Sequence, residues 1–237
     1  MSDALSLSRP GGLLQDTDRP SLRAETMQHR ADIERILKLS PVMPVVIIEE
    51  PDVAAELEQA FVRGGIRVIE VTLRTAGALR AIEAIARAVP QISVGAGTVL
   101  TRDDLRAATN AGATFAISPG ATSQLLEAGT NAPIPYLPAI ATASELMAGL
   151  AHGYHCFKFF PAGPAGGTAL LKALAGPFPQ ARFCPTGGIT QETVKSYLDL
   201  PNVLCAGGSW LSPADALAAR DWPRIEALAA RAAASRT

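Results

Sequence analysis

The chain has 237 residues, of which 48% are hydrophobic and 18% are charged, and its formal net charge is -1. This composition excludes a disordered chain, and the near-neutral charge gives no electrostatic reason to expect nucleic acid or an anionic membrane as a partner. No apolar run approaches the roughly 18 residues of a membrane span, and the N-terminus lacks a basic region followed by an apolar core. We therefore expect a cytoplasmic protein with reduced cysteines.

The N-terminal part of the chain divides into two segments. Residues 1–27 mix Ser, Pro, Gly, Asp and Arg without periodicity, which predicts a weakly ordered extension. Residues 28–39 carry Ile33, Ile36 and Leu37 at helical spacing, which predicts a leading helix. We expect residues 28–237 to form one domain.

Apolar strand candidates and Ala-rich amphipathic segments then alternate every 20–25 residues, as in consecutive βα units. The strands are expected to begin near Pro44, Val68, Ile92, Thr114, Pro135, Cys156, Arg182 and Val203. The helical segments include Asp52–Arg63, Ala78–Ala88, Asp103–Ala111, Ser144–Ala151, Thr168–Ala173 and Gln191–Leu198. Eight such units predict an α/β fold, a closed (β/α)8 TIM barrel with an additional N-terminal helix, whose active site lies at the carboxyl ends of the strands. An open doubly wound sheet is the alternative, because periodicity does not prove closure.

Two threonines are expected to begin helices. Thr101 precedes Asp103 and Asp104, and Thr190 precedes Glu192, so each offers a side-chain cap followed by an acidic first turn.

Lys158 lies in the run Phe157–Pro161, which is otherwise apolar and is typical of a buried strand. Strand alternation places Lys158 and Phe160 on one face. A lysine is rarely buried without a purpose, and one that is neutralised by its surroundings can form a Schiff base with a carbonyl. The alternative is a lysine at a strand end that reaches water through its long stem.

The strand that begins at Val68 also carries polar residues on one face. Alternation groups Glu70, Thr72 and Arg74. Polar groups on the inner face of a barrel strand are costly unless they serve a site, although a Glu70–Arg74 ion pair that fills the barrel would also explain them.

Glycine-rich segments follow several strands. Val94–Thr98 does not complete a dinucleotide-binding motif, so we expect its glycines to allow a ligand close to the backbone, where Thr98 offers a hydroxyl. Thr186-Gly187-Gly188 and Gly207-Gly208-Ser209 stand at the ends of the seventh and eighth strands, where barrels commonly bind phosphate through backbone N–H groups.

A metal site is not expected. His152 and His155 lie three residues apart beside Cys156, but no carboxylate-rich motif accompanies them, and a loop with incidental histidines is the favoured interpretation.

Six motifs in order resemble the bacterial 2-keto-3-deoxy-6-phosphogluconate (KDPG) aldolase and 4-hydroxy-2-oxoglutarate (KHG) aldolase family. They are residues 64–75, 94–100, 115–120, 157–162, 183–189 and 205–211. The resemblance implies a class I aldolase that cleaves KDPG to pyruvate and glyceraldehyde 3-phosphate, and KHG to pyruvate and glyoxylate. It also implies a homotrimer, a small phosphorylated keto-sugar acid as substrate, and neither metal nor cofactor.

The resemblance assigns roles to individual residues. Lys158 would form the imine, and Glu70 would move protons. Arg74 and Thr98 would hold the pyruvate carboxylate, while Phe160 and Pro119 would line the pocket. The phosphate end would be bound by Thr186, Gly187, Gly188, Gly207, Gly208 and Ser209.

Three alternatives remain open at this point. The first is a sister aldolase for 2-keto-3-deoxy-6-phosphogalactonate. The second is a phosphate-binding barrel isomerase in which Glu70 is the base, and the third is a sugar-phosphate sensor without catalytic activity. Neither an isomerase nor a sensor needs an imine at Lys158.

Overall fold

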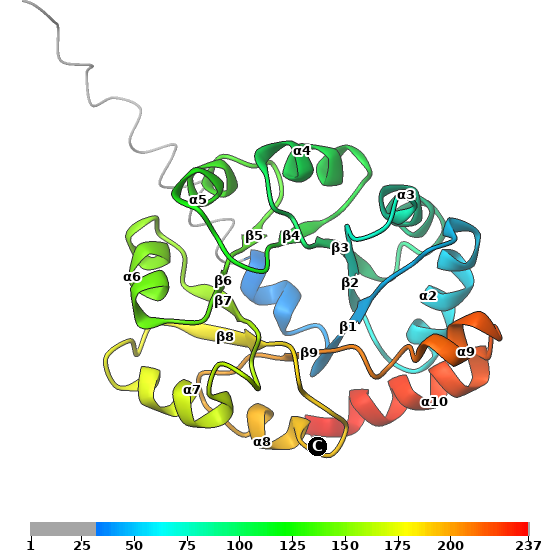
Figure 1. Cartoon of the computed structure of the whole chain (residues 1–237). Helices are drawn as coiled ribbons and strands as arrows, with labels where there is room; N and C mark the ends of the chain where they lie inside the picture. The colour runs from blue at the N-terminus through cyan, green and yellow to red at the C-terminus, as the bar shows by residue number, and fades with distance from the viewer. Residues whose placement is uncertain (1–31, 237) are drawn as a thin grey trace, which may run out of the picture.

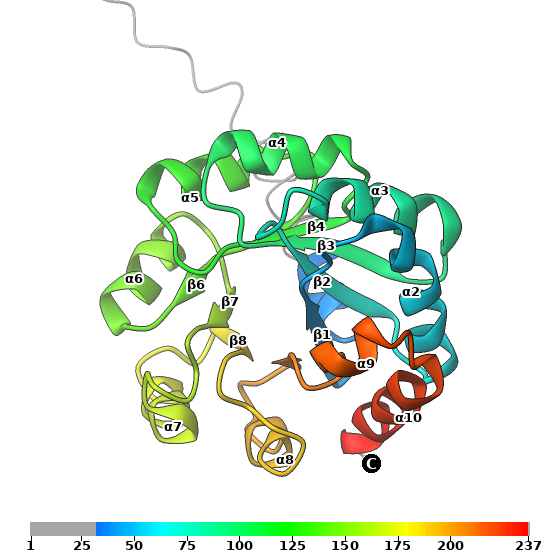
Figure 2. The same ribbon diagram turned by 45° about the vertical axis from the view of Figure 1, so that its right-hand side comes forward.

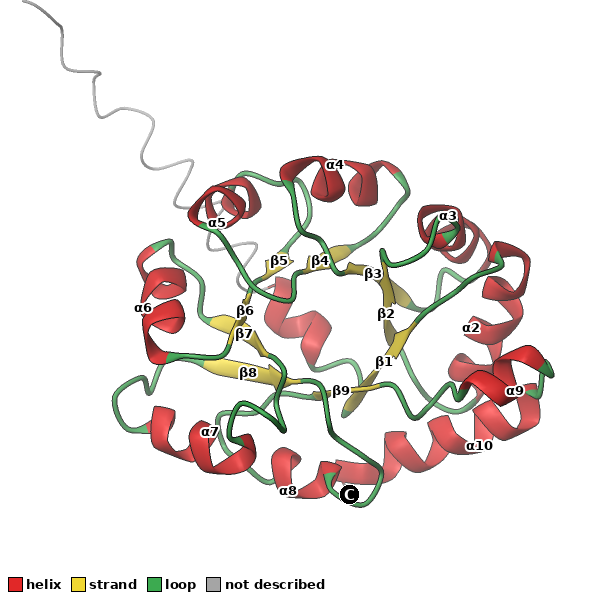
Figure 3. Cartoon of the chain, in the orientation of Figure 1, coloured by secondary structure: helices red, strands yellow, loops and turns green. Residues whose placement is uncertain are grey.

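The computed structural model describes residues 32–236, in which parallel strands alternate with helices. The expected extension, residues 1–27, lies outside the described residues. The strands are β1 (Val42–Val46), β2 (Val68–Thr72), β3 (Ser93–Gly97), β4 (Phe115–Ile117), β5 (Tyr136–Leu137), β6 (Ala139–Ile140), β7 (Cys156–Phe159), β8 (Arg182–Pro185) and β9 (Ala206–Gly208). Figures 1 and 3 show them as a ring with the helices outside.

The helices pack around this ring, as the view in Figure 2 also shows. They are α2 (Ala54–Arg63), α3 (Ala78–Ala88), α4 (Arg102–Asn110), α5 (Ser123–Thr130), α6 (Ala143–Ala151), α7 (Gly167–Ala175), α8 (Val194–Leu198), α9 (Ala214–Ala218) and α10 (Trp222–Ala233), with short 3₁₀ helices η2 (Pro51–Val53) and η3 (Ala234–Arg236). None of these helices in the described part of the chain has the length and apolar character that a membrane span requires.

Strand pairing covers most of the ring in two parallel sheets. One sheet has the order β5-β4-β3-β2-β1-β9 and the other the order β6-β7-β8. Only Pro138 separates β5 from β6, and proline cannot donate a ladder hydrogen bond, so the two short strands share one barrel position. Parallel bridges Phe183↔Val203 and Thr186↔Gly207 connect β8 to β9. The result is a (β/α)8-like fold rather than the open sheet considered as an alternative.

Several predicted boundaries agree with the structure. Helix α3 has the predicted bounds, and β2 and β7 begin at Val68 and Cys156 as expected. Thr101 does cap α4, because its hydroxyl accepts from the Asp104 N–H while the Asp104 carboxylate accepts from the Thr101 N–H.

Two boundary predictions were wrong. Thr190 does not cap a helix: its N–H donates to the Thr193 hydroxyl in a preceding turn, and α8 begins only at Val194. The last strand begins at Ala206 and not near Val203, because Val203 makes a single bridge to Phe183 before the chain joins β1.

The buried residues form two clusters. The larger lies between the strands and the helix layer. The smaller fills the barrel interior and includes Phe115, Leu137 and the three cysteines, together with Ile33, Ile36 and Leu37 from the helical residues 32–37. The first residues of the predicted helix 28–39 lie outside the described range. Figure 1 shows the turns at 32–37 in blue, seen through the opening of the ring of strands.

Candidate active site

The centre of the site is an ion pair between strands on different sides of the barrel. Lys158 Nζ on β7 donates to both carboxylate oxygens of Glu70 on β2, at 2.8 Å and 3.0 Å. The two side chains are only 6% and 2% exposed. A buried charge is tolerated when it is paired and hydrogen-bonded, and each residue meets that requirement through the other. Glu70 is therefore within proton-transfer distance of the Lys158 amine.

The glycines of β3 make room for this pair. A methyl group added at Gly97 would lie 2.1 Å from Glu70 Oε1, and one added at Gly95 would lie 2.3 Å from the Phe115 ring. The side chains of Glu70 and Phe115 occupy the space that a larger residue would need, and the expected approach of a ligand to this backbone stays a prediction. Small residues in β3 thus determine where the Glu70 carboxylate lies.

The other two polar residues of this face of β2, Thr72 and Arg74, make different contacts. The Thr72 hydroxyl donates to the carbonyl of Val46 at 3.1 Å and so fastens β2 to β1. The prediction that Thr72 serves the site together with Glu70 and Arg74 is therefore corrected, since its donor is used by the backbone. Arg74 follows the end of β2, is exposed, and directs Nε to the Thr98 hydroxyl at 3.4 Å. Thr98 has a left-handed backbone with φ 59°.

Of the two residues expected to line the pocket, Phe160 lies near the Lys158 amine and Pro119 does not contact it among the described residues. Lys158 Nζ lies 5.4 Å from the centroid of the Phe160 ring, within cation–π range, as the alternation of the strand predicts. A methyl group added at Gly187 would contact the same ring at 3.3 Å, so Phe160 connects the amine to the glycine loop. Pro119 is half-buried after Ser118, whose hydroxyl is 2.5 Å from that of Tyr136. No contact among the described residues brings Pro119 to Lys158.

The loop after β8 has the features of an anion site. Gly187 and Gly188 have φ values of 98° and 75°, a left-handed pair that favours glycine. Within residues 32–236 neither of their N–H groups makes a hydrogen bond, so both are available to a ligand.

Thr186, Gly207 and Gly208 lie where β8 and β9 meet, and a parallel bridge joins Thr186 to Gly207. A methyl group at Gly207 would lie 2.2 Å from the Thr186 hydroxyl, and one at Gly208 would lie 2.3 Å from the Trp210 ring. Gly207 and Gly208 are the last residues of β9 and not a loop after it, because that strand begins later than predicted. Of the predicted segment Gly207-Gly208-Ser209, only Ser209 lies beyond β9.

A cavity of about 630 Å³ opens beside Ser209 and was not predicted. Its wall includes Ile47, Glu49 and Glu50, which follow β1. Ser212, between β9 and α9, and Arg220, between α9 and α10, also line it. The only signal in the sequence was the position of the two glutamates just after a strand. The lining does not include Lys158 or Glu70, so the cavity does not contain the amine–carboxylate pair.

A buried amine that touches a carboxylate, near the carboxyl ends of barrel strands and beside a loop with available N–H groups, defines a class of barrel enzyme that acts on carbonyl compounds.

Comparison with known proteins identifies the family within that class. The family model for KDPG and KHG aldolase matches residues 33–228, and this chain belongs to that family. The KHG/KDPG aldolase of Escherichia coli K12 is 53% identical over 203 residues, which are 86% of this chain and 95% of the relative. The KDPG aldolase of Dickeya dadantii is 51% identical, over 88% of this chain and 98% of the relative.

Solved structures of relatives have the same fold. The KDPG aldolase of Legionella pneumophila, captured with pyruvate as a covalent carbinolamine, has a TM-score of 0.83 and 47% identity, over 85% of this chain and 98% of its own. The enzyme of Zymomonas mobilis ZM4 with 3-phosphoglycerate also has a TM-score of 0.83, at 45% identity, over 86% of this chain and 96% of its own.

Proposed function

We propose that the protein is a class I aldolase that cleaves KDPG to pyruvate and glyceraldehyde 3-phosphate, and KHG to pyruvate and glyoxylate. The observation that carries this proposal is the buried contact between Lys158 and Glu70. The names of the relatives that are more than half identical to this chain support the choice of substrate.

Lys158 and Glu70 together supply the proton transfers of the first step. Lys158 transfers a proton to Glu70 as the keto acid enters, and the neutral amine attacks the ketone carbon. Glu70 then returns a proton to the carbinolamine hydroxyl, which leaves as water and yields the protonated imine. The covalent carbinolamine in the Legionella relative is an intermediate of this kind.

The same carboxylate serves in the cleavage step. Glu70, directly or through a water, removes the proton from the hydroxyl beyond the α-carbon, the carbon–carbon bond breaks, and the aldehyde leaves. The electron pair passes into the imine and forms an enamine, which is protonated at carbon. Water then hydrolyses the imine, releases pyruvate and restores the Lys158 amine. The imine is the electron acceptor, so this mechanism uses no metal or cofactor.

Substrate contacts are assigned to the residues around this pair. Arg74 and Thr98 bind the carboxylate of the pyruvate portion, with the guanidinium as its cationic partner. The available N–H groups of Gly187 and Gly188 bind the phosphate, as does the hydroxyl of Ser209. Thr186, Gly207 and Gly208 support this loop, and Phe160 and Pro119 exclude water from the imine. The 3-phosphoglycerate in the Zymomonas relative supports a phosphate subsite.

The remaining proposals concern organisation. Residues 28–237 form one domain, in which the turns at 32–37 are the end of an N-terminal helix that covers the amino end of a closed TIM barrel. Residues 1–27 precede this domain as an extension. We propose a cytoplasmic homotrimer, as the family resemblance implies.

Borohydride trapping with pyruvate tests the mechanism. We expect one reduced pyruvyl adduct, located on Lys158 by peptide mapping. Lys158→Arg should lose the adduct and lower kcat by at least about 10⁴-fold. Lys172→Arg, a change at an exposed position of α7, is the matched control and should retain both the adduct and kcat. Folded protein without an adduct would instead favour the isomerase or the sensor.

Comparison of kcat/KM for KDPG, its phosphogalactonate epimer and KHG then tests the substrate. We expect KDPG to give the highest value. A preference for the epimer would identify the sister aldolase while leaving the imine mechanism intact.

A further inference from the structure

A second polar cluster lies at the opposite, amino-terminal end of the barrel strands. It joins Glu34, in the helical turns at 32–37, to His155 and Cys156, where β7 begins. One donor atom from each of the three residues can be chosen so that all lie within 4.8 Å of one another. We propose that Glu34, His155 and Cys156 form a binding site for a divalent transition-metal ion of the zinc type.

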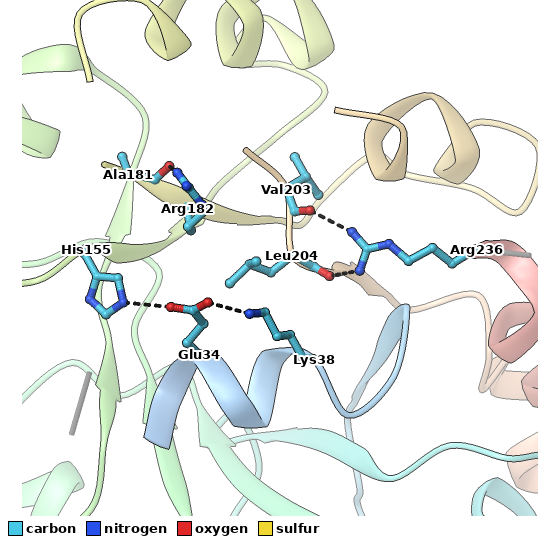
Figure 4. Close-up of polar contacts among 8 residues, drawn as sticks. All are labelled: Glu34, Lys38, His155, Ala181, Arg182, Val203, Leu204 and Arg236. Atoms are coloured by element: carbon cyan, nitrogen blue, oxygen red, sulfur yellow. Dashed lines mark hydrogen bonds and ion pairs between the residues drawn. The ribbon is translucent and has the colours of Figure 1, made fainter. Parts of the chain in front are cut away.

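The geometry brings three different donors together. Glu34 Oε2 lies 3.3 Å from His155 Nε2, a contact that Figure 4 shows between the blue helix and the start of β7. The Cys156 side chain is nearly fully buried, and the other two are half-buried. Donors around a tetrahedral Zn²⁺ are about 3–4 Å apart, so a small side-chain rotation would complete the set and leave a fourth position for water.

The donor types select the metal. A thiolate, an imidazole and a carboxylate form a mixed set that suits Zn²⁺ or Co²⁺, whereas Mg²⁺ prefers oxygen ligands only. Burial is the main reason that the pKa of Cys156 is raised, to about 12, and the Glu34 charge adds to it. The thiol therefore carries its proton when no metal is bound, and on binding that proton passes to solvent.

The cations near the cluster already have hydrogen-bond acceptors. Lys38 Nζ donates to Glu34 Oε1 and leaves Oε2 toward His155. Arg182 donates to the carbonyls of Pro179 and Ala181, and Arg236 donates to those of Val203 and Leu204, as Figure 4 shows for Ala181, Val203 and Leu204. Lys38 is the cation that opposes the metal most directly, since it shares the Glu34 carboxylate.

The structure also changes which residues belong to the cluster. The sequence groups His152 with His155 and Cys156, but His152 Nδ1 lies 2.9 Å from the Ala148 carbonyl at the end of α6. Glu34, 121 residues before His155, takes its place. The carboxylate that the local sequence lacked is thus supplied by the beginning of the described chain.

The test is a titration of metal-depleted, full-length protein with Co²⁺ at neutral pH, monitored by absorption. We expect one ion per chain and a thiolate-to-cobalt charge-transfer band, which Zn²⁺ abolishes by competition and Mg²⁺ does not. Cys156→Ser should remove the band, and His155→Ala should weaken Co²⁺ binding by at least about tenfold. Lys38→Met should strengthen it severalfold.

Controls separate the site from adventitious binding. His152→Ala should bind Co²⁺ as the unmodified protein does, and Cys205→Ser should retain the band. Far-UV circular dichroism identifies any variant that does not fold. If Cys156→Ser does not fold, Glu34→Gln tests the same site at a half-buried position and should weaken Co²⁺ binding. The proposal is overturned by the absence of the band, by its survival in Cys156→Ser, or by equal losses in His152→Ala and His155→Ala.

The proposed metal site does not depend on the proposed function. The cluster lies at the end of the barrel away from the glycine loops, so saturation with Zn²⁺ should raise the Tm without changing borohydride trapping at Lys158.

Discussion

Two glutamates are equally buried in this molecule but lie in different environments. Glu70, inside the barrel, is 1% exposed as a whole residue and receives two hydrogen bonds from Lys158. Glu58, on α2 in the helix layer, is 0% exposed, and neither of its carboxylate oxygens has a hydrogen-bond partner within the described chain. Burial raises the pKa of Glu58 well above its ordinary value of 4.5.

The comparison shows that burial alone does not indicate a site. A buried carboxylate next to a cation can remain charged and exchange a proton with it. A buried carboxylate without a partner takes up a proton and only lowers stability. The proposed mechanism therefore depends on the pairing of Glu70 with Lys158, whereas the buried carboxyl group of Glu58 on α2 only lowers stability.

The same substitution at the two positions should give the largest contrast. We expect Glu70→Gln to lower kcat by about 10²–10⁴-fold, because the proton acceptor next to Lys158 is lost. Glu58→Gln should leave kcat unchanged. Steady-state rates of pyruvate formation from KDPG measure both, and a Glu70→Gln enzyme with normal kcat would remove Glu70 from its role.

The position of the Glu70 carboxylate can be disturbed from β3. We expect Gly97→Ala to lower kcat/KM by roughly 10²-fold, because the new methyl group would displace the carboxylate from Lys158. Gly120→Ala is the matched control, since a methyl group there meets no atom within 4 Å. Equal effects of the two substitutions would show that the Glu70 position is not critical.

Stability should respond at the other glutamate. We expect Glu58→Met to raise the free energy of unfolding by about 1–3 kcal/mol at neutral pH, because it removes a buried polar group without a partner. The folded-state pKa of Glu58 is raised, so folding binds a proton, and the stability of the unmodified protein falls as the pH rises above 4.5.

Urea unfolding at several pH values measures this difference. The advantage of Glu58→Met should be smallest near pH 4 and should grow toward neutral pH. A constant difference across that range would mean that Glu58 does not titrate in the folded protein as its burial implies.

The smallest effect is expected at Glu34, whose carboxylate is paired but partly exposed. Its hydrogen bond with Lys38 is the main cause that lowers its pKa. A lowered carboxyl pKa stabilises the fold above the ordinary value and loses that effect as the pH falls through the folded-state value. Lys38→Met should therefore cost only a few tenths of a kcal/mol at pH 7, and nothing once Glu34 is protonated. The free energy of unfolding of both proteins, measured in metal-free buffer at pH 7 and at an acidic pH where Glu34 is protonated, tests this.

Local regularity explains which predictions from the sequence were correct. The alternation of strand residues placed Lys158 and Phe160 on the same face, and helical spacing gave the bounds of α3. The same alternation grouped Thr72 with Glu70, but it did not reveal that a carbonyl of β1 would use the Thr72 hydroxyl. Short-range patterns determine the direction of a side chain and leave its partner undetermined.

The sequence by itself determined the succession of βα units, the class of fold, and the residue types gathered at the carboxyl ends of the strands, because periodicity and turn residues act over a few positions. Only the tertiary structure decided which of these residues meet. Glu70 reaches Lys158 across 88 residues, and Glu34 reaches His155 across 121. The curled arrangement of the strands brings β2, β7 and the helical turns at 32–37 together. The same packing buries Glu58 without a hydrogen-bond partner among the described residues, although its side chain would face water on an isolated helix.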